Sequence, residues 1–174
     1  MSGDEAFEVE ALAHLDMLYS VARRLVRTQG EAEDLVQETY TRALSGWRRK
    51  PPENVAAWLA TICRNIARDS WRRQAVRPQE VWEGEHLSEM ISPHDTEASA
   101  LANLDAEAVH RALWELPEAT RQAITMVDLG GMTHEEASRA LGVPRGTVLS
   151  RVHRGRKALA ELIREEVKDH GAHT

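Results

Sequence analysis

Apolar residues in the N-terminal part of the chain recur at steps of three and four positions, the spacing that gathers side chains on one face of a helix. Pro51 and Pro52 interrupt the pattern, because proline is tolerated in the first turn of a helix but not in its interior. The pattern predicts three helices, at about 12–30, 31–47 and 53–74. We expect these helices to form one small domain, residues 1–76.

The helical periodicity fails between residues 77 and 103. Gly84 and Pro93 interrupt this segment, and acidic residues, serine and threonine dominate its composition. Such a segment offers little apolar surface to offset the entropy of ordering, so it suits a linker or only marginal helix. We therefore expect an acidic flexible linker here.

Helical spacing returns after the linker. Leu116 is followed by Pro117, which ends one helix, and Gly130 with Gly131 ends the next. Helices are predicted at about 104–116, 121–129, 133–141 and 145–163. No alternating run of β-branched and aromatic residues in the sequence indicates a strand. The predicted fold class is all-α, with two small helical domains joined by the linker, the second of them spanning 104–174.

The last two predicted helices match a helix-turn-helix. Thr133 is a good N-cap, and Glu136 three residues later completes a capping box. Gly142 can adopt the left-handed conformation and Pro144 prevents the helix from continuing, so a tight turn separates a short helix from a long basic one. In this arrangement the N-terminal half of the second helix enters the major groove of DNA.

Several polar residues of the second helix are candidates for contact with duplex DNA. Arginine can bond guanine in a bidentate manner and serine can bond several bases. The candidates for base contacts are Arg145, Thr147, Ser150, Arg151 and Arg154. Arg156 and Lys157 lie further along and better suit phosphate. The alternative is an ordinary solvated bundle helix, but a basic run without an acidic residue is unusual for a mixed soluble surface.

Positive and negative charges are segregated along the chain, which changes how the net charge is interpreted. Lys and Arg number 22 against 28 Asp and Glu, giving a formal net charge of −6, which argues against a simple nucleic-acid-coating protein. Arginines nevertheless gather at 64–77, acidic residues at 78–110, and basic residues again at 142–160. Two basic surfaces therefore flank an acidic spacer.

Other chemistry is poorly supported by the sequence. Cys63 is the single cysteine, so no internal disulfide or four-thiolate metal site can form, which favours a reducing cytoplasm. The N-terminus is acidic, unlike a signal peptide, and no apolar run approaches the roughly 20 residues of a membrane span. His134 starts no H-E-x-x-H motif, and neither a phosphate-binding glycine loop nor a nucleophile elbow is present. We expect no catalytic residues, no metal and no cofactor.

Three sequence segments, taken in order, resemble segments of a known protein family. They are AEDLVQETY at 32–40, AWL at 57–59 with RNIARD at 64–69, and MTHEEA at 132–137 with LGVPRGTVLSRVHR at 141–154. Together they resemble the extracytoplasmic-function, or group IV, sigma factors of the sigma-70 family, over nearly the whole chain. The first two segments are similar to region 2 of that family and the third to region 4.

The resemblance implies a bacterial transcription initiation factor. Such a protein binds core RNA polymerase through the β′ and β subunits, directs it to specific promoters and helps to melt the minus-ten element. The implied partners are the polymerase, promoter DNA and an anti-sigma factor, in the cytoplasm and without membrane insertion. Region 4 would bind the minus-thirty-five element through the helix-turn-helix residues given above.

The resemblance also assigns residues in region 2. The expected polymerase-binding residues are Asp34, Leu35, Gln37, Glu38 and Thr41. The expected minus-ten DNA-binding residues are Arg48, Arg49, Lys50, Trp58, Arg64, Asn65, Arg68, Asp69, Arg72 and Arg73. Trp47 and Trp58 have two interpretations, a stacking face for an unpaired base or an ordinary core aromatic. Leu149 stands where the family often has a basic residue, so the resemblance does not support a DNA contact at this position.

Two further interpretations remain open. By the same resemblance, the acidic linker would run through the RNA exit path of the polymerase, where its negative charge would imitate the transcript; simple solvated disorder explains the composition equally well. A conventional helix-turn-helix regulator would bind duplex DNA without polymerase, but such proteins usually dimerise and the chain offers no heptad seam. An adaptor that binds only protein leaves the basic helix unexplained.

Overall fold

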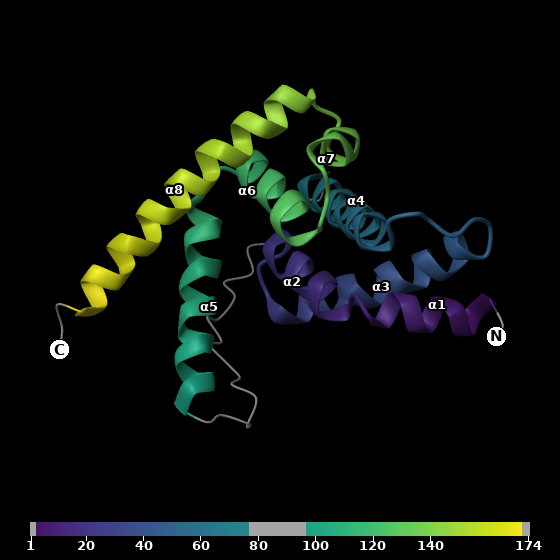
Figure 1. The fold of residues 1–174 in the computed structure, drawn as a ribbon, viewed down its shortest axis with the longest axis horizontal. Helices are drawn as coiled ribbons and strands as arrows, with labels where there is room; N and C mark the ends of the chain where they lie inside the picture. The colour runs from purple at the N-terminus through teal and green to yellow at the C-terminus, as the bar shows by residue number, and fades with distance from the viewer. Residues whose placement is uncertain (1–2, 77–96, 172–174) are drawn as a thin grey trace.

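The computed structural model describes residues 3–76 and 97–171, and all regular structure in these ranges is helical (Figure 1). The elements are α1 (Gly3–Leu12), α2 (Leu15–Leu25), α3 (Gln29–Trp47), α4 (Val55–Val76), α5 (Glu97–Glu115), α6 (Glu118–Ile124), the π-helical turn η1 (Thr125–Leu129), α7 (His134–Leu141) and α8 (Arg145–Gly171). The all-α fold class is confirmed for these residues.

The linker expected at 77–103 lies largely outside the described residues, which resume at residue 97. Helix α5 already begins at Glu97, before the domain boundary that we expected at 104. The last residues of the acidic segment are therefore helical.

The helix predicted at 12–30 is shorter in the structure, where α2 spans Leu15–Leu25, and the preceding helix α1 was not predicted. The break between α1 and α2 lets α1 turn back along α3, where Phe7 is buried and lies edge-on to Trp47 with ring centroids 5.6 Å apart. At the end of α1, the hydroxyl of Tyr40 donates a hydrogen bond of 2.9 Å to the carbonyl oxygen of Ala11. Helix α1 is thus held in place by packing and hydrogen bonding to α3.

Helix α3 begins with a capping box that the sequence interpretation overlooked. The Thr28 hydroxyl accepts from the backbone N–H of Glu31 at 3.2 Å, and the Glu31 carboxylate accepts from the backbone N–H of Thr28 at 2.9 Å. The spacing of threonine and glutamate is the signal that identifies this helix start. Buried side chains of α3 then pack against both α2 and α4.

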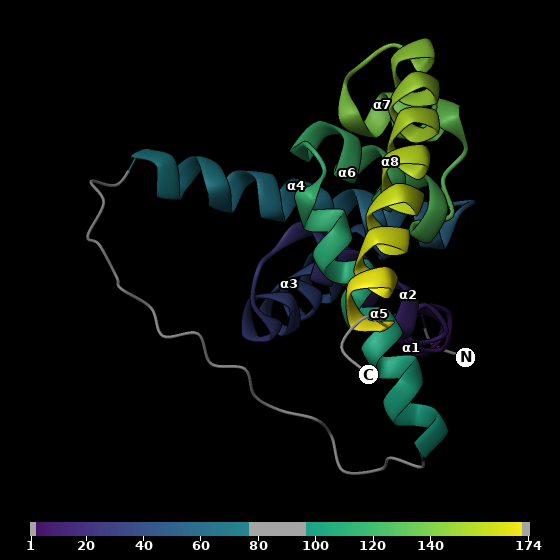
Figure 2. The same cartoon turned by 90° about the vertical axis from the view of Figure 1, so that its left-hand side faces the viewer.

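The two predicted domains share one hydrophobic core in the structure. Turn η1 contacts α2, α4 and α7, and Met126 and Met132 are buried in the same cluster as Leu18 and Leu59. A Cβ atom added at Gly130 would lie 3.1 Å from the Cβ of Ala60, so the backbone after η1 approaches α4 closely. Figure 2 shows α4 crossing the direction of α8 at a steep angle. The residues that the structure describes thus pack across the predicted domain boundary.

Candidate nucleic-acid interface and polymerase-binding face

The turn between α7 and α8 has the geometry that the sequence predicts. The hydroxyl of Thr133 accepts from the N–H of Glu136 at 3.1 Å, and the carboxylate of Glu136 accepts from the N–H of Thr133 at 2.8 Å. Gly142 has φ 67°, in the left-handed region that favours glycine. Across the turn, the Ser138 hydroxyl donates to the carbonyl of Val143 at 2.6 Å. The predicted capping box and left-handed turn are both confirmed.

Helix α8 is held to the rest of the molecule by one apolar face. Val148 and Val152 are buried on this face. Gly155 continues it at the crossing with α6, where an added Cβ atom would lie 2.5 Å from side-chain atoms of both Ile124 and Thr120. This close crossing fixes the rotation of α8 and therefore determines which residues face solvent.

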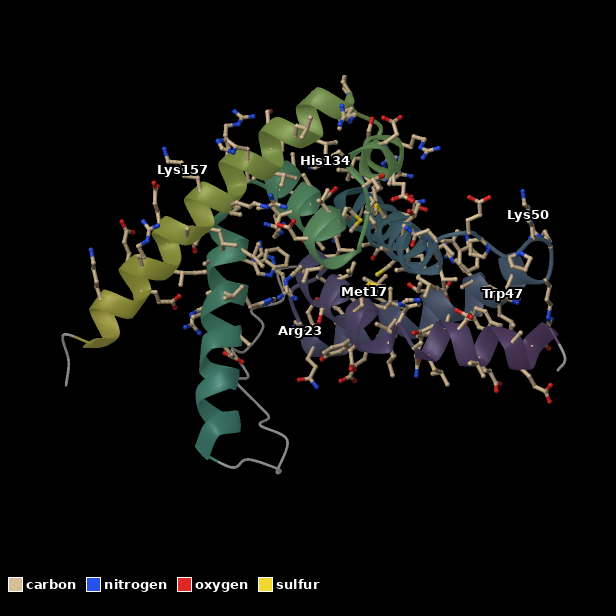
Figure 3. The ribbon with its side chains drawn as sticks, viewed as in Figure 1. Met17, Arg23, Trp47, Lys50, His134 and Lys157 are labelled. Carbon is tan, nitrogen blue, oxygen red and sulfur yellow. The ribbon has the colours of Figure 1, made fainter. Side chains whose placement is uncertain are left out.

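The opposite side of α8 carries most of the predicted duplex-binding residues. Arg145, Ser150, Arg154, Arg156 and Lys157 are exposed, whereas Thr147 and Arg151 are half-buried. The guanidinium of Arg154 donates to the carbonyl and hydroxyl oxygens of Ser150, each at 3.3 Å. Arg156 forms an ion pair with Asp128. Figure 3 shows Lys157 pointing outward from α8.

The basic loop after α3 is also exposed. Arg48, Arg49 and Lys50 all face solvent, and Figure 3 shows Lys50 at the far end of the molecule from Lys157. The guanidinium of Arg48 donates to both carboxylate oxygens of Asp4, at 2.9 and 2.6 Å, and these hydrogen bonds lower the pKa of the Asp4 carboxyl. The loop thus presents three cations, one of them paired.

The two tryptophans near this loop differ in their surroundings. Trp47 is buried at 9 % exposure among α1 and α3 residues, so its ring belongs to the core. Trp58 is half-buried, and its ring lies against Gly46, where an added Cβ atom would approach it to 2.9 Å. Trp58 also lines an open hollow of about 400 Å³ together with Asn54 and Glu136. Of the two, Trp58 is the one with a face toward a cavity.

Arginines predicted to bind the minus-ten element differ in exposure along α4. Arg72 and Arg73 are exposed, and Asn65, Arg68 and Asp69 are half-buried. Arg64 is buried at 8 % exposure, and one guanidinium nitrogen donates to the carbonyl of Ala140 in α7 at 3.0 Å. Two others approach the amide oxygen of Gln122 at 3.4 Å. In this arrangement the C-terminal domain covers Arg64.

The polar face of α3 is free of such cover. Asp34, Gln37, Glu38 and Thr41 are exposed and lie at the helical spacing of one face. The Thr41 hydroxyl donates to the carbonyl of Gln37 at 2.9 Å, and Glu38 pairs with Arg42 at 2.6 Å. Leu35 is buried at 5 % exposure, so it supports this face from the core instead of forming its surface.

Cys63 is buried, and burial raises the pKa of its thiol to about 12. The thiolate, which is the reactive form, is therefore scarce at neutral pH. Over the described residues, no group of three or more His, Cys, Asp and Glu side chains is arranged to hold a metal ion. In the same ranges no helix has the length and apolarity to cross a membrane.

An exposed helix-turn-helix with a basic outer face, joined to a second helical domain that carries further exposed cations, defines a DNA-binding protein of the helix-turn-helix class. Comparisons with known proteins identify the family. Residues 11–77 match the family model described as sigma-70 region 2, and residues 106–159 match sigma-70, region 4.

Among curated proteins, the chain is 34% identical over 155 residues to the ECF RNA polymerase sigma factor EcfG of Rhodopseudomonas palustris, covering 88% of this chain and 83% of the relative. It is 34% identical over 151 residues to ECF RNA polymerase sigma factor SigE of Mycolicibacterium smegmatis, covering 86% of this chain but 58% of that longer relative. Among solved structures, the sigma factor RpoE in complex with the anti-sigma factor NepR from Bartonella quintana aligns with a TM-score of 0.68 at 27% identity, covering 92% of this chain and 98% of that one. The chain belongs to the sigma-70 family, in its extracytoplasmic-function group, and is a transcription initiation factor.

Proposed function

We propose that the chain docks on core RNA polymerase through the exposed polar face of α3 and recognises the minus-thirty-five element through the exposed face of α8. The observation that carries this proposal is that both faces are open to solvent and belong to different domains of one chain. Core polymerase then supplies the additional surface for holding promoter DNA that a single small domain lacks. The protein acts by placement of the polymerase and has no catalytic chemistry of its own.

The minus-ten element is bound by the basic loop after α3 and by α4. Its phosphates meet Arg49, Lys50, Arg72 and Arg73, which are already exposed. Arg64 can join them only when the C-terminal domain moves away, because Ala140 and Gln122 now cover it. We therefore infer that polymerase docking, which needs no such movement, precedes separation of the domains.

An anti-sigma factor is a further proposed partner. The RpoE structure that aligns with most of this chain was solved in complex with the anti-sigma factor NepR. A partner that held the two domains together would keep the minus-ten surface covered. Cytoplasmic location is proposed on the same family grounds.

Replacing Asp34 by lysine tests polymerase docking. We expect Asp34→Lys to weaken competition for core polymerase about tenfold, because a reversed charge at a desolvated contact costs on the order of 1–2 kcal/mol. The matched control is Glu33→Lys, which makes the same charge change about 100° around the helix. Equal competition by the two variants, measured against a labelled sigma factor, would remove this face of α3 from the docking site.

Replacing Arg154 by alanine tests duplex recognition. If Arg154 contacts a base, its loss costs on the order of 1–3 kcal/mol and relaxes preference at one promoter position. Arg164→Ala is the control, since Arg164 is exposed further along the same helix. Run-off transcription from a promoter series would show reduced selectivity for the first variant alone. Unchanged selectivity would take Arg154 off the recognition surface.

A conventional regulator is the alternative that these experiments exclude or support. Strong operator binding by the free chain, with no association with core polymerase, would favour the regulator. The sigma-factor function instead predicts weak promoter binding by the free chain and strong binding in the complex.

A further inference from the structure

A basic cleft lies where the two domains meet. It has a volume of about 390 Å³, and its lining includes Arg64, Arg68 and Arg72 from α4, and Arg151 from α8. The lining also includes the carboxylate of Glu118, at the start of α6. Four guanidinium groups therefore face one carboxylate among the described lining residues. The arginines on α4 are spaced four apart, so they form a row along one wall of the cleft.

The guanidinium groups of this cleft are incompletely satisfied. Arg64 has one hydrogen bond of 3.0 Å to Ala140 and two weaker approaches of 3.4 Å to Gln122. The Nε atom of Arg68 is buried without a hydrogen-bond partner, and the nearest carboxylate oxygen, on Asp69, lies 3.7 Å away. Buried donors without partners cost free energy, which an acceptor placed in the cleft would recover.

The electrostatics of the cleft favour an anion. Burial lowers the pKa of the Arg64 guanidinium, and the like charges of Arg68 and Arg72 lower it further, while Glu118 and Asp69 act in the opposite sense. The amide of Gln122 donates a hydrogen bond of 2.8 Å to one oxygen of the Glu118 carboxylate, so part of that carboxylate is already paired within α6. The cationic charge is thus concentrated and only partly neutralised.

We propose that this cleft binds a short phosphate chain of two or three phosphates, free or carried by a nucleotide, and that the bound anion holds the two domains together. Planar guanidinium groups bond phosphate oxygens in bidentate pairs, and several of them on one wall match successive phosphates of a chain. The ligand bridges the domains, because Arg64, Arg68 and Arg72 belong to one domain and Arg151 to the other. It therefore opposes exposure of the minus-ten surface. The regulatory consequence rests on the proposed function, but the binding site does not.

Thermal unfolding of the free, full-length chain tests the site. We expect pyrophosphate and triphosphate at saturating concentration to raise the Tm by about 5 °C relative to sulfate at equal ionic strength. Adenosine triphosphate is compared as a further ligand in the same experiment. An affinity equal to that of triphosphate assigns recognition to the phosphates alone, and a higher affinity adds a contact from the nucleoside.

Variants from both walls provide the specific comparison. Arg72→Ala and Arg151→Ala, separately and together, should weaken pyrophosphate binding about tenfold or more, because each removes a charge-assisted bond. Arg49→Ala is the control, as it deletes an exposed arginine outside the cleft. Isothermal titration gives the dissociation constants, and circular dichroism confirms that each variant is folded.

Three results would overturn the site. The first is stabilisation by sulfate equal to that by pyrophosphate, and the second is an equal loss of binding in Arg49→Ala. The third is tighter binding of a short single-stranded oligonucleotide at the same arginines, which would assign them to nucleic acid in the free chain. None of these measurements contains polymerase or a promoter. Failure of sigma activity and failure of the phosphate site are therefore distinguishable.

Discussion

Cross-linking the two domains is expected to abolish promoter opening while leaving polymerase binding intact. Asn54 and Glu136 offer a place for the link, since the amide of Asn54 donates to the carboxylate of Glu136 at 3.2 Å across the domain contact. A variant with cysteine at both positions can be joined by a short thiol-reactive reagent. Cys63 will not compete, because it is buried and its thiol pKa is raised to about 12.

The physical reason is distance. The minus-ten and minus-thirty-five elements are about 25 base pairs apart by name, which is about 85 Å along B-DNA at about 3.4 Å per base pair. Helix α8, the longest element at 27 residues, is only about 40 Å long. A link that fixes the domains in this packing prevents them from adjusting to that separation, so we expect the gain from joint occupancy, about 10²- to 10⁴-fold for linked sites, to be lost.

Run-off transcription measures promoter opening, and a polymerase competition assay measures polymerase binding. Each single-cysteine variant treated with the same reagent serves as a control for modification alone. A cleavable reagent adds a second control, because reduction should restore transcription. Full transcription by the cross-linked chain would show that the packed arrangement is itself the active one.

Replacing Gly155 by valine is expected to destabilise the C-terminal domain by about 3 kcal/mol, the upper range for overpacking a close helix crossing. The first added atom would already lie 2.5 Å from Thr120 and Ile124, so α8 must move away from α6. The displaced helix would no longer present Arg154 and its neighbours together. Loss of minus-thirty-five recognition should therefore accompany loss of stability.

Gly146→Val is the matched control for this substitution. Gly146 is the second residue of the same helix, and an added Cβ atom there meets no atom within 4 Å. Because valine has a higher helix propensity than glycine, this change should leave stability unchanged or raise it by less than about 1 kcal/mol. Urea unfolding followed by circular dichroism measures both variants. Equal midpoints would show that the crossing tolerates a side chain.

Local signals in the sequence gave the recognition motif correctly. The capping box at Thr133 and the left-handed Gly142 depend on residues a few positions apart, so their geometry follows from the sequence alone. The same spacing of threonine and glutamate at Thr28 and Glu31 indicates the start of α3.

Features that depend on residues far apart in the sequence could not be predicted from local signals. The burial of Arg64 arises from Gln122 and Ala140, which are 58 and 76 positions away. An arginine row on a helix has the same sequence pattern whether solvent or another domain covers it. The position of α1 likewise depends on the contact of Phe7 with Trp47, which are 40 positions apart. Helical periodicity identifies a buried face, but not the element that buries it.

The π-helical turn η1 is a further place where tertiary packing outweighs the local preference for an α-helix. The periodicity predicted one helix at 121–129, and the structure instead changes from α6 to η1 at Thr125. The N–H of Gly130 donates to the carbonyl of Thr125 at 2.9 Å, which closes the wider turn. This brings Gly130 close to Ala60 of α4. π-helical turns are rare and lack a sequence signature strong enough to compete with α-helix propensity.

The ion pairs of Arg48 with Asp4 and of Arg156 with Asp128 have a consequence for how DNA binding responds to salt. An arginine that exchanges its own carboxylate for a phosphate leaves that carboxylate to recruit a cation from solution. The cation that the carboxylate takes up offsets part of the counterions that the DNA releases. The logarithmic dependence of promoter affinity on salt concentration should therefore be shallower than the number of phosphate contacts implies. Replacing Asp4 or Asp128 by asparagine should steepen it by up to about one ion each.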